Sequence, residues 1–360
     1  METDDNNSDI RHLLLTYWPH IFQSSSNDLL ISLISQPGSV NTNWRICLPS
    51  TTTSYVLKRL KHEQNPQYEL NYLIDFQKYL DTSFQVPQPV PLSSSQAIFI
   101  EYNNHFYWLY EHINGIIHKT DFNEKQLLSL ATCLSKYHRF LITHDPPLHK
   151  TEQSHRRQEL LDELVTSVKM ITSEKQQQSE TLEIDLVEDY IFDCYPQLSK
   201  LIKESLRKHQ TVTTTNRSYP IHRDIRPGNV VWNDNNNVVG LLDFENVDAN
   251  VCNTLWSDLA ICLLTFCCSD DDQSQSDMIK IQILLDEYLK QVFNGLSIPT
   301  STKHEFINLI LDEMILCSIE DYLFLYWQYR NEREKFQGLN EMKLYYKRSI
   351  WHYENKSKFY

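Results

Sequence analysis

Several features that commonly define the class of a protein are missing from this sequence of 360 residues. Lys and Arg total 33 against 47 Asp and Glu, a net charge of −14, and the chain has no basic tract. Nucleic-acid backbones and anionic membranes are held by clustered Lys and Arg, so neither is expected as the main partner. A cationic or metal-bridged ligand fits this charge better.

Export and membrane-spanning segments are also missing. The N-terminal sequence METDDNNSDI is polar and acidic, where a secretory signal has a basic start followed by an apolar run. The longest apolar stretch, Leu259 to Cys268, is interrupted by Thr265 and is too short to span a bilayer. We therefore expect a cytoplasmic protein.

Cysteine is present but not in the patterns that bind zinc. The 8 cysteines include no C-x-x-C pair and no His/Cys cluster at zinc spacing, so buried reduced thiols are expected. Hydrophobic residues make up 41% of the chain and aromatic residues 12%, which is enough for a substantial core and excludes wholesale disorder. The length allows one large domain or two lobes.

The N-terminal third of the chain has the pattern of a small antiparallel sheet with one helix. Between Leu29 and Ile113 the apolar residues mostly form short runs rich in Val, Ile, Tyr and Phe. Asn103-Asn104 separates two such runs and favours a hairpin turn. Asn65-Pro66 is a helix-start signal, and the apolar periodicity then continues to Leu80.

After Gly115 the pattern changes to long helices. Asp121 and Glu124 form a capping-box signal ahead of a helical periodicity. We predict an α+β chain with a protein-kinase-like arrangement of two lobes: a β-rich N-terminal lobe, residues 1–112, and a mostly helical C-terminal lobe, residues 113–360, interrupted by one β-hairpin. Further helices are expected at 154–173, 184–208, 256–268, 275–293, 303–334 and 340–355.

The predicted hairpin lies in the sequence IHRDIRPGNVVWNDNNNVVGLLDFENVD, residues 221–248. Asn229 to Asp234 and Val238 to Asp243 have the pattern of strands, joined by three asparagines suited to a turn. A three-residue loop would pair Asp234 with Val238 and would place Asn229 opposite Asp243. An amide oxygen and a carboxylate held that close form a hard-oxygen site suited to Mg²⁺.

Asp224 lies five residues before Asn229, in a loop that Pro227-Gly228 keeps out of a helix. A carboxylate at this position is placed to accept a proton from an attacking hydroxyl beside the metal. The pattern H-x-D-x-x-x-x-N followed by a strand-borne Asp thus supplies the base and the metal ligands that phosphoryl transfer requires. In the alternative interpretation, Asp224 and Asn229 only cap turns.

The sequence from Ile221 to Asp248 resembles the signature of the aminoglycoside phosphotransferase family, the protein-kinase-like small-molecule kinases. The resemblance implies a two-lobed kinase fold that uses ATP and Mg²⁺ to phosphorylate a hydroxyl of a small molecule. It also implies that Asp224 is the catalytic base, and that Asn229 and Asp243 hold magnesium. His222 would brace the catalytic loop, and Asp258 would anchor that loop from the start of a helix.

The N-terminal lobe contains candidates for the nucleotide site. Period-2 alternation in SYVLKRL places Lys58 on the face of Val56 and Leu60, an unusual position for a lysine unless an anion lies there. Kinases use such a strand lysine to hold phosphates and pair it with a helix glutamate. Glu69 is the candidate partner, with Glu63 close by, although an edge-strand charge and a first-turn carboxylate are the structural alternatives.

Other parts of the nucleotide site are less strongly marked. Gly38 lies in a possible turn over the phosphates, where backbone N–H groups would form the cradle. In a chain with only 6 glycines, single glycines at Gly38, Gly115 and Gly228 suggest positions that need unusual backbone freedom. Binding of adenine by the backbone of Glu111 and Ile113 is implied by the resemblance alone.

A protein kinase and a pseudokinase are the two alternatives to a small-molecule kinase. Arg223 gives the protein-kinase spelling HRD, but only 15 positions separate Asp243 from Asp258, too few for an activation segment. A pseudokinase that binds nucleotide or acts as a scaffold is the second alternative, although Asp224, Asn229 and Asp243 are all present. We therefore favour an active small-molecule kinase.

The acceptor is indicated only weakly. Acidic residues near the site or on a late helix would suit an amine-bearing alcohol, although solvated surface charges are the alternative interpretation. Aromatic residues on the same helix would suit a quaternary ammonium group, although helically spaced aromatics usually belong to the core. These candidates are Glu245, Asp248, Glu320 and Asp321, and the aromatic residues Tyr322, Tyr326 and Trp327.

Overall fold

The computed structural model divides the chain into two compact units. The first contains residues 1–117 and 230–245, and the second contains residues 118–229 and 246–360. Gly38 and all but one residue of the predicted helix 154–173 lie outside the described residues. The described residues are 3–23, 28–34, 41–49, 51–60, 66–80, 84–93, 95–144, 166, 186–213, 219–245, 247, 255–269, 272–293, 300–331, 336–355 and 357.

The first unit contains a five-stranded antiparallel sheet and a separate two-stranded hairpin. The large sheet has the strand order β1-β2-β3-β5-β4, and the hairpin pairs β6 with β7. Asn103 and Asn104 both adopt positive φ between β4 and β5, which confirms the predicted turn. The strands are β1 (Leu30–Leu33), β2 (Thr42–Cys47), β3 (Ser54–Arg59), β4 (Ile100–Tyr102), β5 (His105–Glu111), β6 (Val230–Trp232) and β7 (Val238–Leu241).

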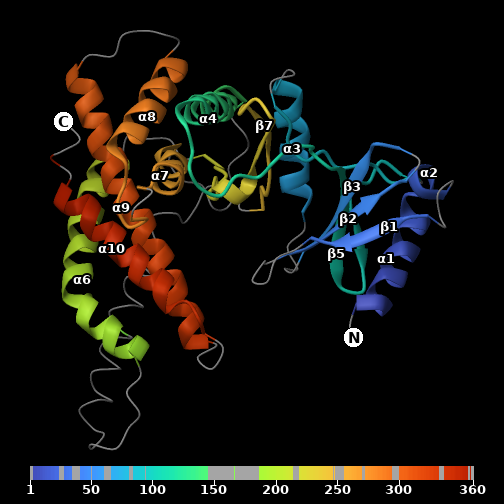
Figure 1. Cartoon of the computed structure of the whole chain (residues 1–360), viewed down its shortest axis with the longest axis horizontal. Coiled ribbons are helices and arrows are strands. Elements are labelled where there is room, and N and C mark those ends of the chain that lie inside the picture. The colour runs from blue at the N-terminus through green and yellow to red at the C-terminus, as the bar shows by residue number, and fades with distance from the viewer. Residues whose placement is uncertain are drawn as a thin grey trace, which may run out of the picture. The chain divides into compact units, whose positions relative to one another are not determined.

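Three helices accompany these strands: α1 (Thr3–Tyr17), α2 (Pro19–Phe22) and α3 (Gln67–Tyr79). The sequence pattern predicted α3 but not α1 or α2. In α1 the polar residues at the start hide the apolar periodicity that follows. Ile10, Leu13 and Leu14 recur at helical spacing and are buried in one cluster with residues of β2, β3 and β5. Figure 1 shows α1 lying along the sheet.

The predicted register of the β6–β7 hairpin is wrong. Val238 pairs with Trp232 instead of Asp234, and Val230 pairs with Leu241 after a shift between Val231 and Trp232. The cause is the turn, because the Asn233 side chain accepts hydrogen bonds from the backbone N–H groups of Asn235 and Asn237. The loop therefore begins earlier than the three asparagines, and Asn229 lies in a 3₁₀ turn, Pro227–Asn229, instead of a strand.

The described part of the second unit is helical. The α4 start differs from the prediction, because Asn123 and Gln126 exchange side-chain hydrogen bonds with each other's backbone N–H, whereas Asp121 adopts a positive φ. None of the helices in the described residues is long and apolar enough to cross a membrane. These helices are α4 (Glu124–His144), α6 (Leu186–Thr213), α7 (Leu255–Phe266), α8 (Met278–Val292), α9 (Thr300–Asn331) and α10 (Leu339–Asn355).

Two groups of contacts organise these helices. Residues of α6, α9 and α10 share one buried cluster, and these three helices lie side by side in Figure 1. A buried hydrogen bond of 2.7 Å joins His138 of α4 to Tyr288 of α8. The predicted α+β fold, with an antiparallel N-terminal sheet and a mostly helical remainder, is confirmed.

The scarce glycines do not mark the strained backbone positions. Neither Gly115 nor Gly228 has a positive φ, whereas Arg223 and Asp243 have φ values of 64° and 63°. Gly115 is required for close approach instead, since an added Cβ would lie 2.5 Å from the Trp232 carbonyl oxygen. The interpretation of Gly115 and Gly228 as sites of unusual backbone freedom is therefore wrong.

Candidate active site

Asp258 in the first turn of α7 anchors the loop that contains Asp224. Its carboxylate accepts hydrogen bonds from the backbone N–H of His222 at 3.0 Å and of Arg223 at 2.6 Å. These two bonds hold Arg223 in its left-handed conformation, which is unfavourable for a side chain with a Cβ. Asp258 is fully buried, and the anchoring role that the sequence implied for it is confirmed.

His222 is a structural residue of the same loop. Its Nδ1 accepts a hydrogen bond from the backbone N–H of Asp224 at 3.2 Å, and its ring packs edge-on against Tyr137 of α4. The ring is completely buried. His222 therefore fixes the backbone beside Asp224, as the resemblance implied.

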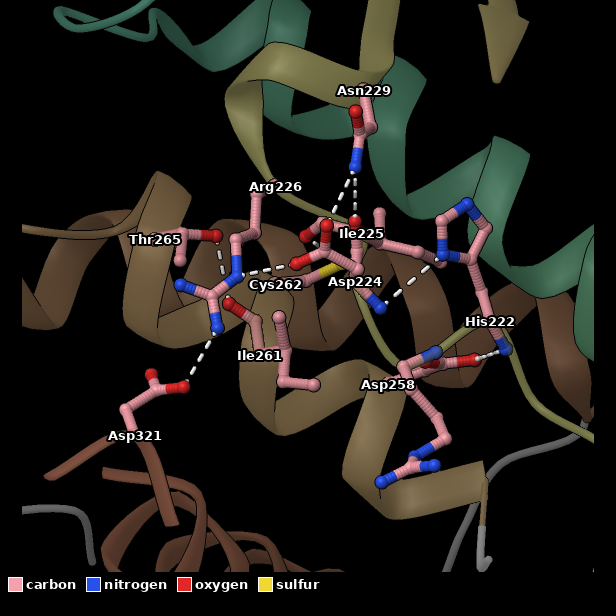
Figure 2. Close-up of polar contacts among 11 residues, drawn as sticks. His222, Asp224, Ile225, Arg226, Asn229, Asp258, Ile261, Cys262, Thr265 and Asp321 are labelled. Carbon is pink, nitrogen blue, oxygen red and sulfur yellow. Dashed lines mark hydrogen bonds and ion pairs between the residues drawn. The ribbon is translucent and has the colours of Figure 1, made fainter. Parts of the chain in front are cut away.

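Asp224 and Asn229 are brought together by the loop and the 3₁₀ turn (Figure 2). The amide nitrogen of Asn229 donates to the backbone carbonyl of Asp224 and to its carboxylate Oδ2, both at 2.9 Å. With the nitrogen used in this way, the amide oxygen of Asn229 is the atom with the chemistry of a magnesium ligand. One short segment of the second unit thus presents a partly exposed carboxylate beside an oriented amide.

In the first unit, the buried Lys58 forms an ion pair with the partly exposed Asp243. The Nζ–Oδ1 distance is 2.7 Å, and Glu245 lies 3.7 Å from the same ammonium group. Lys58 is only 4% exposed on β3, so the unusual position predicted from its strand alternation has a counter-charge. Its hydrogen-bond partner is Asp243, whereas Glu69 acts on Lys58 through its charge.

The charges around Lys58 perturb one another strongly. Burial by itself would lower the pKa of Lys58, but Asp243, Glu69 and Glu245 together raise it above its ordinary value. Burial raises the pKa of Glu69 to about 7; Lys58 opposes this rise, while Asp243 and Glu245 reinforce it. Asp243 and Glu245 alone outnumber the ammonium group by one negative charge, and Glu69 adds a second when it is ionised. This excess suits a divalent cation.

Aromatic packing places Asp243 near α3. The next residue, Phe244, is buried, and its ring centroid lies 6.4 Å from that of Tyr72 and 6.1 Å from that of Phe76. Tyr72 and Phe76 belong to α3, the helix that also contains Glu69. Asp243 adopts a left-handed φ at the point where the chain leaves β7 and turns toward this aromatic contact.

The amide oxygen of Asn229 and the carboxylate of Asp243 are each hard donors of the kind that Mg²⁺ prefers. The structure places these residues in different units: Asn229 with Asp224 in the second, and Asp243 with Lys58 and Glu69 in the first. The described residues contain no cluster of three or more His, Cys, Asp or Glu side chains arranged to bind a metal.

The predicted adenine-binding segment follows directly from the central sheet. Glu111 is the last residue of β5 and pairs with Tyr55, and the backbone N–H of His112 donates to the Ser54 carbonyl at 2.8 Å. Ile113 is buried, close to Gly240 of β7. Adenine binding by Glu111 and Ile113 remains a prediction.

Arg226 was missed from the sequence, and Glu245 and Asp321 were interpreted differently from what the structure shows. Glu245 accepts a hydrogen bond from the Asn41 side chain and faces Lys58, so it belongs to the lysine cluster. Arg226 contacts both Asp224 and Asp321, a role that no sequence pattern indicated. The position of Arg226, two residues after Asp224, could have indicated a role beside that carboxylate. No pattern in the sequence indicates that Asp321 on α9 is its second partner.

The aromatic residues proposed for an ammonium site divide into two groups. Tyr322 and Tyr326 are buried in the cluster shared by α6, α9 and α10, so the core alternative holds for them. Trp327 is 54% exposed and stacks with Phe324 at a centroid distance of 6.4 Å. Asp248 lies outside the described residues.

An antiparallel sheet with a buried lysine, one helix bearing Glu69, and an Asp-Asn loop anchored by a helix aspartate define a kinase-like fold of the small-molecule phosphotransferase type. The sequence model of the phosphotransferase enzyme family, APH, matches residues 36–290. The chain belongs to this family, which confirms the resemblance identified from the sequence. No curated protein matches the sequence significantly.

Solved structures with the same fold extend over nearly the whole chain. Spectinomycin phosphotransferase APH(9)-Ia, solved with ADP and spectinomycin, has a TM-score of 0.65 at 13% identity and covers 97% of this chain and 98% of its own. Amicoumacin kinase hAmiN, solved with AMP-PNP, Ca²⁺ and Ami, has a TM-score of 0.59 at 13% identity, with 96% of each chain covered. Plasmodium vivax ethanolamine kinase has a TM-score of 0.59 at 13% identity and covers 97% of this chain and 89% of its own.

Proposed function

We propose that the protein transfers the γ-phosphoryl group of ATP, in the presence of Mg²⁺, to a hydroxyl group of a small amine-bearing molecule. Asp224 is the proposed base, Asn229 and Asp243 are the proposed magnesium ligands, and Lys58 is the proposed phosphate ligand. Membership of the phosphotransferase enzyme family supports this reaction class.

The observation that carries the proposal is the arrangement of Asp224 and Asn229. Asn229 holds the Asp224 carboxylate at 2.9 Å, while His222 and Asp258 hold the backbone on either side of Arg223. A carboxylate fixed in this way is suited to orient an acceptor hydroxyl and take its proton, without covalent participation of the enzyme. Turn capping alone accounts for neither the buried Asp258 anchor nor the partial exposure of Asp224.

The charge around Lys58 supports the nucleotide side of the proposal. Bound Mg²⁺ would supply neutralisation of the developing phosphate charge, and Lys58 would hold phosphate oxygens. Lys58 now pairs with Asp243, and the cluster has a net negative charge when its carboxylates are ionised. A divalent cation at Asp243 would compensate this charge and release Lys58 for phosphate.

The amine-bearing class of the acceptor is supported by relatives of the same fold. Their names include spectinomycin phosphotransferase and ethanolamine kinase, and the second of these substrates is an amino alcohol. The net charge of −14 also favours a cationic ligand over an anionic one. We therefore rank amino alcohols, aminoglycosides and hydroxy amino acids as the first acceptors to screen.

The first test is thermal unfolding of the full chain with and without Mg-ATP. A ligand present at about 100 times its Kd adds about 2.7 kcal/mol to the free energy of unfolding, which shifts Tm by a few degrees for a chain of this size. We expect this shift in the wild type, and we expect it to be lost in Asp243→Ala. Asp234→Ala, which removes an exposed aspartate from the same hairpin, is the matched control and should keep the shift.

The second step measures ADP formation with each acceptor in the screen. Acceptor-dependent ADP formation by the wild type is the expected result. Binding of Mg-ATP without transfer to any acceptor would favour the nucleotide-binding pseudokinase, and no shift at millimolar Mg-ATP would favour a scaffold that binds no nucleotide.

A further inference from the structure

Arg226 connects the proposed catalytic loop to two helices near the C-terminus. Its Nε lies 2.6 Å from Oδ1 of Asp224, and its Nη2 donates a hydrogen bond of 2.9 Å to Oδ1 of Asp321 on α9 (Figure 2). The charge of the guanidinium group also acts on Tyr345 of α10, where it opposes the rise that burial causes in the pKa of the hydroxyl. The guanidinium therefore has one ionic contact in its own loop and one on a distant helix.

The charges in this group favour an ionised arginine between two carboxylates. Burial by itself would lower the pKa of Arg226, but Asp321 and Asp224 raise it above its ordinary value. For Asp321, burial raises the pKa, while Arg226 acts in the opposite direction. The three side chains are about one-third exposed, so solvent screens part of this attraction. The hydrogen bond to Asp321 adds direction to the attraction.

These contacts bear on Asp224 because its two oxygens are held from different sides. Oδ2 accepts the hydrogen bond from Asn229, and Oδ1 faces Arg226. Rotation of the carboxylate would break one of the two interactions. The orientation of Asp224 therefore depends on where Arg226 lies, and Arg226 is held by Asp321.

The second half of this connection lies outside the part of the chain that matches the family. The family match ends at residue 290, whereas Asp321 and Tyr345 belong to α9 and α10. Asp321 is 95 residues from Arg226 in sequence. The two C-terminal helices thus reach the proposed base through a single side chain.

We propose that Arg226 is a positioning residue for Asp224, and that Asp321 holds Arg226 in the position where it orients that carboxylate. The expected effect on kcat rests on the proposed phosphoryl transfer. In this proposal Asp321 does not bind the amine of an acceptor, because its carboxylate is already paired with the guanidinium group of Arg226.

The kinetic test compares Asp321→Asn, Arg226→Gln and the double variant in the full chain, using the best acceptor from the screen. Each single variant should lower kcat about 10- to 100-fold, because misplacing a reacting group by about 1 Å costs about 10² in rate. KM for Mg-ATP and for the acceptor should change little. The double variant should be no slower than the slower single variant, since both changes disrupt the same Arg226–Asp321 interaction.

Two control variants separate positioning from loss of charge or stability. Glu305→Gln removes one exposed carboxylate from the same helix and should leave kcat unchanged. Asp321→Glu keeps the charge and should retain more activity than Asp321→Asn. A large rise in acceptor KM with unchanged kcat in Asp321→Asn, or additive effects in the double variant, would overturn the proposal in favour of direct acceptor binding.

A crystal structure of full-length Asp321→Ala tests the same inference without an activity assay. We expect Arg226 to leave Oδ1 of Asp224 and the carboxylate to rotate away from its wild-type orientation. If both side chains keep their wild-type positions, Asp321 does not position them and the proposal is wrong. Absence of Mg-ATP binding and transfer in the wild type would instead reject the proposed function, while the crystal structure would still decide the role of Asp321.

Discussion

The carboxylate of Asp224 shows how much of a proposed active site depends on single side chains. One oxygen accepts a hydrogen bond from Asn229, the other contacts Arg226, and the backbone N–H donates to His222. Three residues within five positions of Asp224 therefore contact it directly. A substitution that keeps this shape and removes the charge isolates the chemical role of the carboxylate.

Asp224→Asn makes this change. We expect turnover to fall by about 10² to 10⁴, the range for removal of a positioned general base, while Mg-ATP binding stays nearly intact. Steady-state kinetics with the best acceptor and the thermal shift with Mg-ATP measure the two properties. Equal turnover in the wild type and the variant would remove Asp224 from the role of base.

At the level of the elements, loops and helices of the second unit are held by buried polar groups. Ser276, just before α8, contacts Nε2 of His352 on α10 at 2.9 Å, and Nδ1 of His352 lies 2.7 Å from the Arg348 carbonyl oxygen. A neutral ring satisfies both contacts, with Nδ1–H as donor and Nε2 as acceptor. Burial accordingly lowers the pKa of His352 to about 4, although the Arg348 carbonyl opposes the decrease.

This burial predicts a pH dependence of stability. The folded pKa of His352 is about 4 and the ordinary value is 6.5. As the pH falls from about 6.5 to 4, the unfolded chain therefore takes up a proton that the folded chain does not bind. The wild type should lose up to about 3 kcal/mol of unfolding free energy more than His352→Gln over this interval. Urea unfolding at several pH values measures the difference, and parallel pH curves for the two proteins would contradict it.

For the molecule as a whole, the dominant electrostatic feature is the net charge of −14. Excess charge of one sign destabilises a compact chain through self-repulsion, and salt screens it over about 30 Å at 0.01 M but over about 10 Å at 0.1 M. Raising NaCl from about 0.01 M to 0.15 M should therefore raise Tm. Calorimetry measures this rise, which should persist in Asp243→Ala because it does not require cation binding at the proposed metal site. A Tm that falls with salt would show that attractive ion pairs outweigh the repulsion.

Much of the architecture was predictable because helices and hairpins leave local patterns. The periodicity over 256–268, 275–293, 303–334 and 340–355 corresponds to α7, α8, α9 and α10. Asn103-Asn104 supplied the only residues needed for the β4–β5 turn. The first helix escaped prediction although Ile10, Leu13 and Leu14 carry its signal, since the residues before them are polar and acidic.

The sequence by itself determined the order and spacing of His222, Asp224 and Asn229, because these residues act within one short loop. Tertiary structure alone decided which charges meet: Lys58 meets Asp243 across 185 positions and Arg226 meets Asp321 across 95. It also decided the left-handed backbone at Arg223, which is held by Asp258 from another helix. The physical reason is that local patterns reflect backbone geometry and burial, whereas an ion pair depends on how distant elements pack and leaves no periodic trace in the chain.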